Sequence, residues 1–202
     1  FSWDLEFFGY APTGMTSLPL FKWYARGIAL SFLLIAGFSF ALAHRNGVNG
    51  RTFAKRLAQI GGAALLISAA TWLATPDRFV FFGILHQIAA AALISVLFLR
   101  ANVAATLAAA VAIAALPHLF RHEFLNAPWF WWTGLGTVQP ATNDFVPVFP
   151  WTGYVLFGLA LGKMALARQF LSWPSATAPV QSAPGRGLAF LGRHSLIYYL
   201  VH

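Results

Sequence analysis

The segment "FVFFGILHQIAAAALISVLF", residues 79–98, decides the fold class of this chain. It has about the ~20 apolar residues that a helix needs to cross the hydrocarbon layer of a bilayer. The exceptions to its apolar character are two neighbours, His86 and Gln87. Because a polar side chain facing lipid is costly, both are expected to face the interior of a helical bundle or a wet cavity.

The composition of the whole chain supports a membrane protein. Of its 202 residues, 59% are hydrophobic and 9% are charged, whereas a soluble domain has about 25% charged residues. The sequence therefore predicts an all-α, polytopic transmembrane helical bundle. Apolar runs long enough to span a bilayer occur about six times, at residues 21–42, 57–74, 79–99, 101–120, 150–167 and 188–202. We expect one domain, residues 1–202, truncated at both ends and preceded by at least one more span.

Small residues predict where these helices approach each other closely. Gly158 and Gly162 lie four residues apart and so share one helix face. The segment "GGAA" from Gly61 forms a second small-residue patch. Both patterns are typical of close helix contacts in membranes.

The charges predict an orientation and argue against nucleic acid as a partner. The net charge is +8, but the cations are scattered between apolar runs and do not cluster on one face. All five acids lie in alternate connections, which the positive-inside rule assigns to the outer side. The remaining connections are predicted to be cytoplasmic and carry Arg45, Arg51, Lys55, Arg56, Arg100, Lys163, Arg168 and Arg186.

Histidines are the candidate catalytic bases, because the chain has no cysteine and no recognisable serine-nucleophile or metalloprotease motif. His86 is expected about 10 Å below the outer boundary, at ~1.5 Å per residue. It could move protons, or it could simply form a hydrogen bond between helices. Gln87 is more readily explained as a structural group that orients a neighbour.

The last apolar run carries a second set of polar side chains. Ser195, Tyr199 and His202 fall on one helix face, which indicates a cavity lining or a helix contact. Arg193 lies at the inner end of this run, where it could bind an anion or extend to the lipid headgroups. His202 is the second candidate base.

The outer connections contain further candidates. Arg26 lies one turn inside the first span and is expected to pair with Asp4, Asp77 or Asp144. Asn143 and Asp144 precede the helix that re-enters the membrane, and Asp144 could cap that helix or face a cavity. The segment "PWFWW", which includes Trp131, is either an interfacial aromatic belt or a stacking platform for a sugar or a lipid-linked acceptor.

Five segments carry a resemblance to a known family: "FSWDLEFFGY", "FKWYARGIALSFLLIAGFSFALAHR", "TWLATPDRFVFFGILHQIAAA", "TNDFVPVFPWTGYVLFGLALGK" and "LGRHSLIYYLVH". In this order they resemble the bacterial membrane family that contains the catalytic domain of heparan-alpha-glucosaminide N-acetyltransferase. The resemblance implies a multi-pass enzyme of the cell inner membrane. It would move an acetyl group from cytoplasmic acetyl-CoA to a sugar or glycan amine or hydroxyl on the far side. The matching first outward segment, residues 1–19, contains no histidine, so a catalytic histidine of that loop is not carried over.

For the implied reaction, the candidate residues fall into three groups. The base would be His86 or His202, with Asp144 as a further catalytic candidate. Anionic donor phosphates require inner cations, and the candidates are Arg51, Lys55, Arg56 and Arg193. Candidates for acceptor binding are Asp4, Arg26, Gln87, Asn143, Trp131 and Tyr199. We expect a polar passage that joins a cationic inner mouth to an acidic and aromatic outer one.

Other functions remain open on sequence alone. The expected partners are the lipid bilayer, acyl-CoA, a glycan acceptor and further copies of the chain, and no metal is expected. The alternatives are a permease or flippase subunit, in which His86 and Arg26 would belong to a transport path, or a scaffold without activity. The scarcity of carboxylates inside the predicted spans argues against a proton-coupled transporter.

Overall fold

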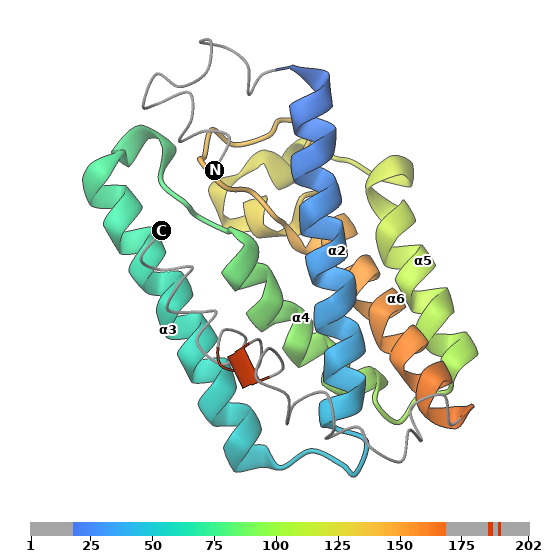
Figure 1. The fold of residues 1–202 in the computed structure, drawn as a ribbon. Coiled ribbons are helices and arrows are strands. Elements are labelled where there is room, and N and C mark those ends of the chain that lie inside the picture. Colours follow the sequence, from blue (N-terminus) through green and yellow to red (C-terminus); the bar gives the residue numbers. More distant parts are fainter. Residues whose placement is uncertain (1–17, 169–185, 188–189, 191–202) are drawn as a thin grey trace.

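The computed structural model describes residues 18–168, 186–187 and 190 as a bundle of helices that run in alternating directions (Figure 1). The α-helices are α2 (Pro19–Ala43), α3 (Gly50–Ala74), α4 (Ile84–Phe98), α5 (Val103–Leu119) and α6 (Val148–Ala167). The 3-10 helices are η2 (Pro76–Arg78), η3 (Glu123–Asn126) and η4 (Pro128–Thr133). Asp4, Arg193, Ser195, Tyr199 and His202 lie outside the described residues, as does nearly all of the predicted span 188–202.

Two of the described helices, α2 and α3, are long and apolar enough to cross a membrane. Helices α4 and α5 are shorter apolar helices. The prediction was wrong about where the second helix begins, because α3 starts at Gly50 and not at residue 57. Asn49 caps this end by accepting a hydrogen bond from Thr52 N–H at 3.1 Å. Arg51, Lys55 and Arg56 therefore lie on the first two turns of a helix and not in a connection.

The segment of residues 79–98 is only partly helical, so the predicted helical span over residues 79–99 is also wrong about its start. Helix α4 begins at Ile84, and the residues before it are extended. Phe82 forms a parallel bridge with Phe145, and Val146 N–H donates to Phe82 O at 3.0 Å. These contacts are supplied by the segment before α6, so the extended backbone is covered by protein, as membrane depth requires.

The distribution of polar and apolar side chains is that of a bundle in lipid. Gln87, Ser95, Thr106 and Thr152 have exposed fractions of 0%. Large apolar side chains lie outside instead, and Leu20 and Leu97 are 75% and 76% exposed. In water this arrangement would be unfavourable, but in a bilayer the apolar exterior is solvated by acyl chains.

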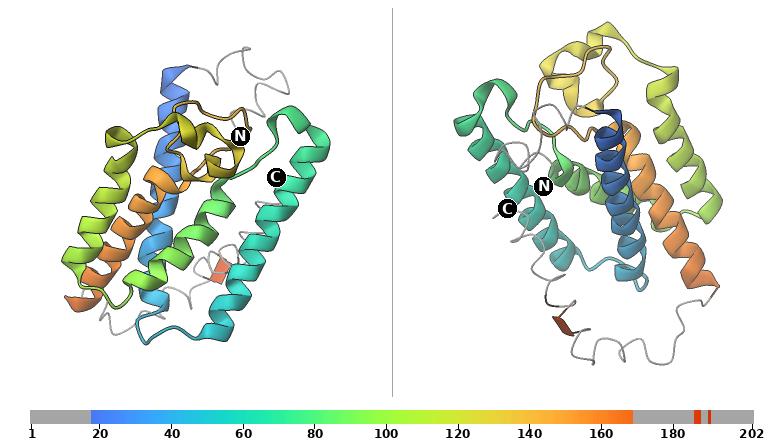
Figure 2. Two further views of the ribbon diagram at one scale, coloured as in Figure 1. Left: turned by 180° about the vertical axis from the view of Figure 1, so that it is seen from behind. Right: turned by 45° about the horizontal axis from the view of Figure 1, so that its top comes forward.

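Helix α6 lies between α2 and α5 (Figure 2) and makes its most extensive contacts with them. Glycines permit the contact with α2. A Cβ on Gly158 would collide with the carbonyl of Leu34, and one on Gly37 would collide with the carbonyl of Val155. The predicted close approach at Gly158 and Gly162 is confirmed. The prediction for the "GGAA" patch is confirmed only in part. Ala63 and Ala64 are buried in a cluster with Leu85 of α4, whereas a Cβ on Gly61 would have no neighbour within 4 Å among the described residues.

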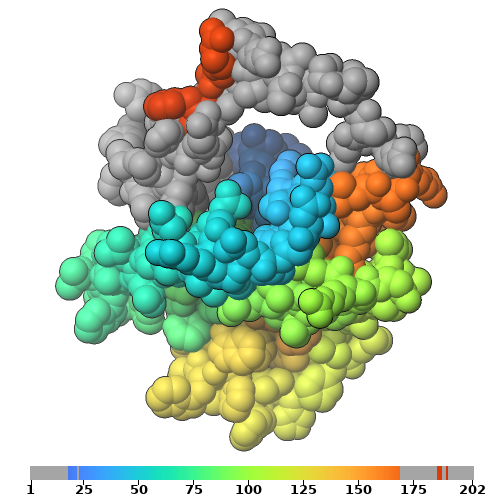
Figure 3. All heavy atoms as spheres, turned by 90° about the horizontal axis from the view of Figure 1, so that it is seen from below, coloured from blue at the N-terminus to red at the C-terminus, as the bar shows by residue number. Residues whose placement is uncertain are grey.

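The predicted separation of charges is also confirmed for the described residues. Because the helices alternate in direction, Arg45, Arg51 and Arg100 lie at one end of the bundle and Asp77 and Asp144 at the other. In the view onto the cationic end (Figure 3), the connection between α2 and α3 lies near the connection between α4 and α5, and both line one pocket. We call the cationic end the inner end and the other the outer end, following the positive-inside rule.

Lys163, near the inner end of α6, joins three elements. Its ammonium donates to the carbonyl oxygen of Phe98, to that of Ala101 at 2.7 Å, and to Thr106 Oγ1 at 3.1 Å. A cation at carbonyls that end a helix is favourable both as a hydrogen-bond donor and because of the helix dipole. Lys163 thus fixes the connection between α4 and α5 against α6.

Lys163→Met is expected to lower the stability of the purified protein by about 2 kcal/mol, because hydrogen bonds from a charged donor to half-buried acceptors are lost. Thermal unfolding in detergent measures the effect. Arg168→Met, which removes an exposed cation at the end of the same helix, should leave the unfolding temperature nearly unchanged. Equal losses of stability in Lys163→Met and Arg168→Met would show that the change in net charge, and not the hydrogen bonds of Lys163, lowers the stability.

Candidate functional site

His86 lies in the first turn of α4, where both ring nitrogens have partners. Gly83 N–H donates to Nδ1 at 3.3 Å, and Nε2 lies 3.2 Å from Ser68 Oγ. The Ser68 hydroxyl donates its hydrogen to Val80 O at 2.6 Å, so its oxygen accepts from the ring. These contacts assign His86 as the neutral tautomer that carries its proton on Nε2. Its lone pair is on Nδ1.

His86 lies well below the outer end of α3 although its own helix starts late. Ser68 lies about 9 Å below the outer end of α3 at Ala74, at ~1.5 Å per residue. His86 contacts Ser68, so the extended residues 79–83 carry it to that depth before α4 begins. The imidazole is half-buried and also packs against the ring of Phe82, with ring centroids 5.5 Å apart.

Asp144 lies at the same place as His86, although 58 positions separate them along the chain. Its Oδ2 accepts a hydrogen bond from Ile84 N–H at 2.8 Å. The carboxylate therefore caps α4 and not α6, whose preceding residue, Pro147, forms no side-chain cap. His86 and Asp144 together line a small pocket of about 10 Å³, which has room for about one water.

Neighbouring polar groups hold these two segments in register. Asn143 Nδ2 donates to Thr75 Oγ1 at 3.0 Å, and its backbone N–H donates to Arg78 O at 2.9 Å. Thr142 Oγ1 donates to Phe79 O at 2.7 Å. Among the described residues, Asn143 therefore joins the connection after α3 to the segment before α6.

Gln87 is fully buried between α4 and α6. Its Nε2 donates to Thr152 Oγ1 at 2.8 Å. Its Oε1 has no hydrogen-bond partner among the described residues. His86 and Gln87 are neighbours in the sequence but face different helices. His86 faces α3 and Gln87 faces α6.

An outer pocket of about 460 Å³ brings together two of the predicted acceptor residues, Arg26 and Trp131. Arg121 and Trp151 line it as well, whereas no Asp or Glu of the described residues does. Of the three carboxylates proposed as partners of Arg26, Asp77 and Asp144 do not line this pocket, and Asp4 is outside the described residues. The outer mouth, expected to be acidic and aromatic, is cationic and aromatic where it is described.

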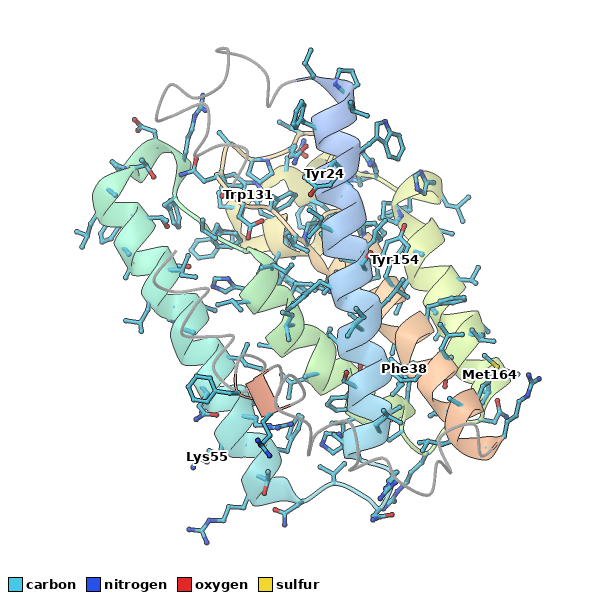
Figure 4. All side chains as sticks on the ribbon, in the orientation of Figure 1. Tyr24, Phe38, Lys55, Trp131, Tyr154 and Met164 are labelled. Carbon is cyan, nitrogen blue, oxygen red and sulfur yellow. The ribbon has the colours of Figure 1, made fainter. Side chains whose placement is uncertain are left out.

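The aromatic segment "PWFWW" contains both exposed side chains and one that lines the outer pocket. Trp129 is 83% exposed and Trp132 is 42% exposed, as in an interfacial belt. Trp131 is half-buried, donates its indole N–H to Asn126 O at 2.7 Å and lines the outer pocket. It lies at the end of the bundle opposite Lys55 (Figure 4).

The inner end contains two adjoining pockets that share His44. The larger, about 560 Å³, is lined by His44, Arg45 and Arg100. The smaller, about 170 Å³, is mainly apolar and lies between α2, α3 and α4, with Arg56 and Ile88 in its lining. Arg51 and Lys55, two of the predicted donor residues, line neither pocket.

Helix α4 connects the inner pockets with His86. Its residues Val96 and Leu97 line the larger inner pocket, Ile88 and Ala92 line the smaller one, and His86 lines the pocket shared with Asp144. These pockets follow one another along the helix over about 15 Å, at ~1.5 Å per residue. The small pocket at His86 shares no lining residue with the inner or the outer pockets. The sequence predicts one continuous polar passage. Among the described residues, the structure instead has a series of separate pockets.

Several groups of this region were not singled out from sequence. Ser68 and Thr152 are ordinary hydroxyls in apolar runs, and only the folded contacts distinguish them. Arg100 and Arg121 directly follow apolar runs, so their sequence positions alone indicate charges of the connections. His44 was not among the candidate site residues, yet its Nδ1–H donates to Phe40 O at 2.9 Å and the residue lines both inner pockets.

Comparison with known proteins gives one result. Neither the curated proteins nor the solved structures yield a match to this chain. A family model described as heparan-alpha-glucosaminide N-acetyltransferase, catalytic, matches residues 1–202. The chain therefore belongs to this family of membrane-bound acetyltransferases, which use acetyl-CoA as the donor.

Proposed function

We propose that this protein transfers an acetyl group from acetyl-CoA at its inner end to an amine or hydroxyl of a sugar or glycan at its outer end, in the cell inner membrane. The family match supports acetyl transfer. The observation that supports the direction of transfer is the order of the separate pockets along α4, from a cationic inner pocket to the small pocket at the imidazole of His86.

The inner pockets fit the chemistry of a coenzyme A thioester. Arg45 and Arg100 provide guanidinium groups for phosphates, and Arg56 adds a third at the apolar pocket. The apolar walls around Ile88 and Ala92 suit an uncharged arm that extends toward His86. Arg51 and Lys55, which are exposed on α3, would contribute only at long range. Arg193 remains a proposed donor contact.

His86 is proposed as the general base. Transfer breaks the thioester C–S bond and forms a C–N or C–O bond, and the acceptor's proton has to move to the departing sulfur. The Nδ1 lone pair can take up this proton once the acceptor replaces Gly83 N–H as its hydrogen-bond donor. Nε2–H, held by Ser68, keeps this tautomer in place.

Asp144 is proposed as a positioning residue. Its hydrogen bond to Ile84 N–H holds the first turn of α4, which carries His86. A Cβ on Gly83 would collide with this carboxylate, so a larger residue there would have to displace Asp144 from Ile84. His202 remains the second candidate base, and Asp4 and Tyr199 remain proposed acceptor contacts.

Arg100→Gln is expected to raise the KM for acetyl-CoA about 10-fold or more, because a charge-assisted contact to phosphate is worth about 1.5–3 kcal/mol. The measurement is the rate of glucosamine acetylation by purified full-length protein against acetyl-CoA concentration. In Arg51→Gln, which alters a side chain outside the pocket, KM should stay within about 2-fold, since exposed charges contribute little. If Arg51→Gln raised KM and Arg100→Gln did not, the donor would bind along α3 and not in this pocket. Failure of the unaltered protein to acetylate any amine or hydroxyl acceptor would refute the proposed function.

A further inference from the structure

The connection between α4 and α5 carries Arg100 into the larger inner pocket. It consists of residues 99–102, which lie between the end of α4 and the start of α5. Arg100 lines the pocket together with His44 and Arg45, which follow the end of α2. A guanidinium binds phosphate best when its direction is fixed. The contribution of Arg100 to anion binding therefore depends on what holds this short connection in place.

Lys163 of α6 holds the connection on both sides of Arg100. Its ammonium donates to the carbonyl oxygens of Phe98 and Ala101, the second at 2.7 Å. The first carbonyl lies two residues before Arg100 and the second lies one residue after it. Lys163 does not line the pocket, so it is not placed to contact a ligand there. Its effect on such a ligand has to pass through the connection.

The same ammonium also joins the connection to α5. Lys163 donates to Thr106 Oγ1 at 3.1 Å, and the Thr106 hydroxyl donates to Asn102 O at 2.9 Å. Thr106 has an exposed fraction of 0%, and hydrogen bonds shielded from water are costly to break. The last residue of the connection is thus held by a chain of contacts that starts at Lys163.

Lys163 has no carboxylate partner at its own end of the bundle among the described residues. The acids that the structure describes, Asp77, Glu123 and Asp144, belong to the outer segments. The carbonyl oxygens that accept from Lys163 leave its charge in place, and Arg45 and Arg100 lie at the same end. Cations gathered in this way repel each other and favour a bound anion.

We propose that Lys163 is a positioning residue of the donor site, which directs the guanidinium of Arg100 toward the phosphates of coenzyme A. The inference rests on the proposed function in one respect, since it takes the larger inner pocket as the place where coenzyme A binds. It adds to that function a residue of α6 that lies outside the pocket. Lys163 acts through the geometry of Arg100 and makes no contact with the ligand.

The test measures binding of coenzyme A without an acceptor, so that it does not depend on turnover. Full-length protein in phosphatidylcholine nanodiscs is titrated calorimetrically with coenzyme A. Lys163→Met should weaken binding about 10-fold, as should Arg100→Gln, because each loses the directed charge-assisted contact. Lys163→Met added to Arg100→Gln should weaken binding by no more than a further 2-fold or about that, since residues that act through one contact are not additive.

The kinetic constants separate positioning from a general loss of structure. In the acetylation of glucosamine, Lys163→Met should raise the KM for acetyl-CoA about 10-fold and change kcat by less than about 2-fold, as expected when an interaction with the bound donor is lost. Partial unfolding would instead lower kcat, because less of the protein would be active.

Two variants on α6 control for charge and for stability. Arg168→Met removes an exposed cation of the same helix and should leave the affinity for coenzyme A within about 2-fold. Thr152→Val removes the buried acceptor of Gln87 Nε2 near the outer end of α6. It should lower the unfolding temperature and leave the affinity for coenzyme A within about 2-fold, because the sites are distant. Lys163→Gln, which keeps an amide donor, replaces Lys163→Met if that variant does not fold, and should weaken binding at least about 3-fold.

Four results would overturn the proposal. The first is unchanged affinity in a folded variant of Lys163. The second is an equally large loss in the Arg100→Gln background, because Lys163 would then act by long-range attraction and not through Arg100. The third is a comparable loss in Arg168→Met or Thr152→Val. The fourth is the absence of coenzyme A binding in the unaltered protein. The expected pattern of binding in a protein that acetylates no acceptor would leave the role of Lys163 standing and refute the proposed function instead.

Discussion

His86→Asn is expected to lower the rate of acetyl transfer by about 100-fold or more, the usual contribution of a general base. Asparagine retains an acceptor oxygen that can receive the hydrogen bond from Gly83 N–H, so the first turn of α4 stays capped. It has no nitrogen that can take up the acceptor's proton. The measurement is the initial rate of acetylation of glucosamine by the purified full-length protein.

Two controls separate loss of chemistry from loss of structure. The unfolding temperature of His86→Asn should match that of the unaltered protein within a few degrees. Ser68→Ala removes the contact that holds Nε2–H and is expected to reduce the rate much less, because the base itself remains. Unchanged turnover in His86→Asn would remove His86 from the mechanism and favour a base outside the described residues, with His202 as the first candidate.

Gly158→Ala is expected to destabilise the bundle by about 3 kcal/mol, toward the upper end of the cost of an oversized side chain in a packed interior. The added methyl group would collide with the backbone carbonyl of Leu34, which no side-chain rotation can relieve. Helices α2 and α6 would have to separate along their most extensive contact. Thermal unfolding in detergent, together with the yield of folded protein, measures the effect.

A glycine on the same interface and one outside it give matched comparisons. Gly37→Ala should be as harmful as Gly158→Ala, because its Cβ would meet the carbonyl of Val155. Gly27→Ala, also on α2, meets no described atom within 4 Å and should be neutral or stabilising by about 0.5–1 kcal/mol, the helix preference for alanine. Equal effects at positions 27 and 158 would contradict the close contact of α2 with α6.

The fold class, the charge separation and the glycine contact of α6 could be predicted from sequence because each depends on local composition or spacing. The starts of α3 and α4 could not. Arg51 and Lys55 interrupt the apolar run and therefore resemble a connection, although a single cap at Asn49 is enough to begin a helix there. Phe79 and Phe82 are as apolar as the helix that follows, and only their pairing with a segment more than 60 residues away makes them extended.

The candidate site, like the fold, could be predicted from sequence only in part. The placement of His86 inside the bundle follows from hydropathy, whereas the sequence left the role of Trp131 open between an interfacial belt and a stacking platform. The pairing of Asp144 with α4 does not, because it joins two segments that are distant in sequence. The sequence also cannot choose between Arg51 and Arg100 as the residue that binds an anionic donor, because both lie next to apolar runs. The folded chain shows that Arg100 lines the inner pocket and Arg51 does not.

The most direct test of the account is the sidedness of the reaction in sealed vesicles that contain the full-length protein in one orientation. Acetyl-CoA labelled on the acetyl group is enclosed at the inner end of the protein, and a membrane-impermeant amino sugar is supplied at the outer end. The account predicts labelled N-acetyl product outside, and none when His86 is asparagine. Product formed only when donor and acceptor share one side, or label that crosses the membrane without any acetylated product, would contradict it.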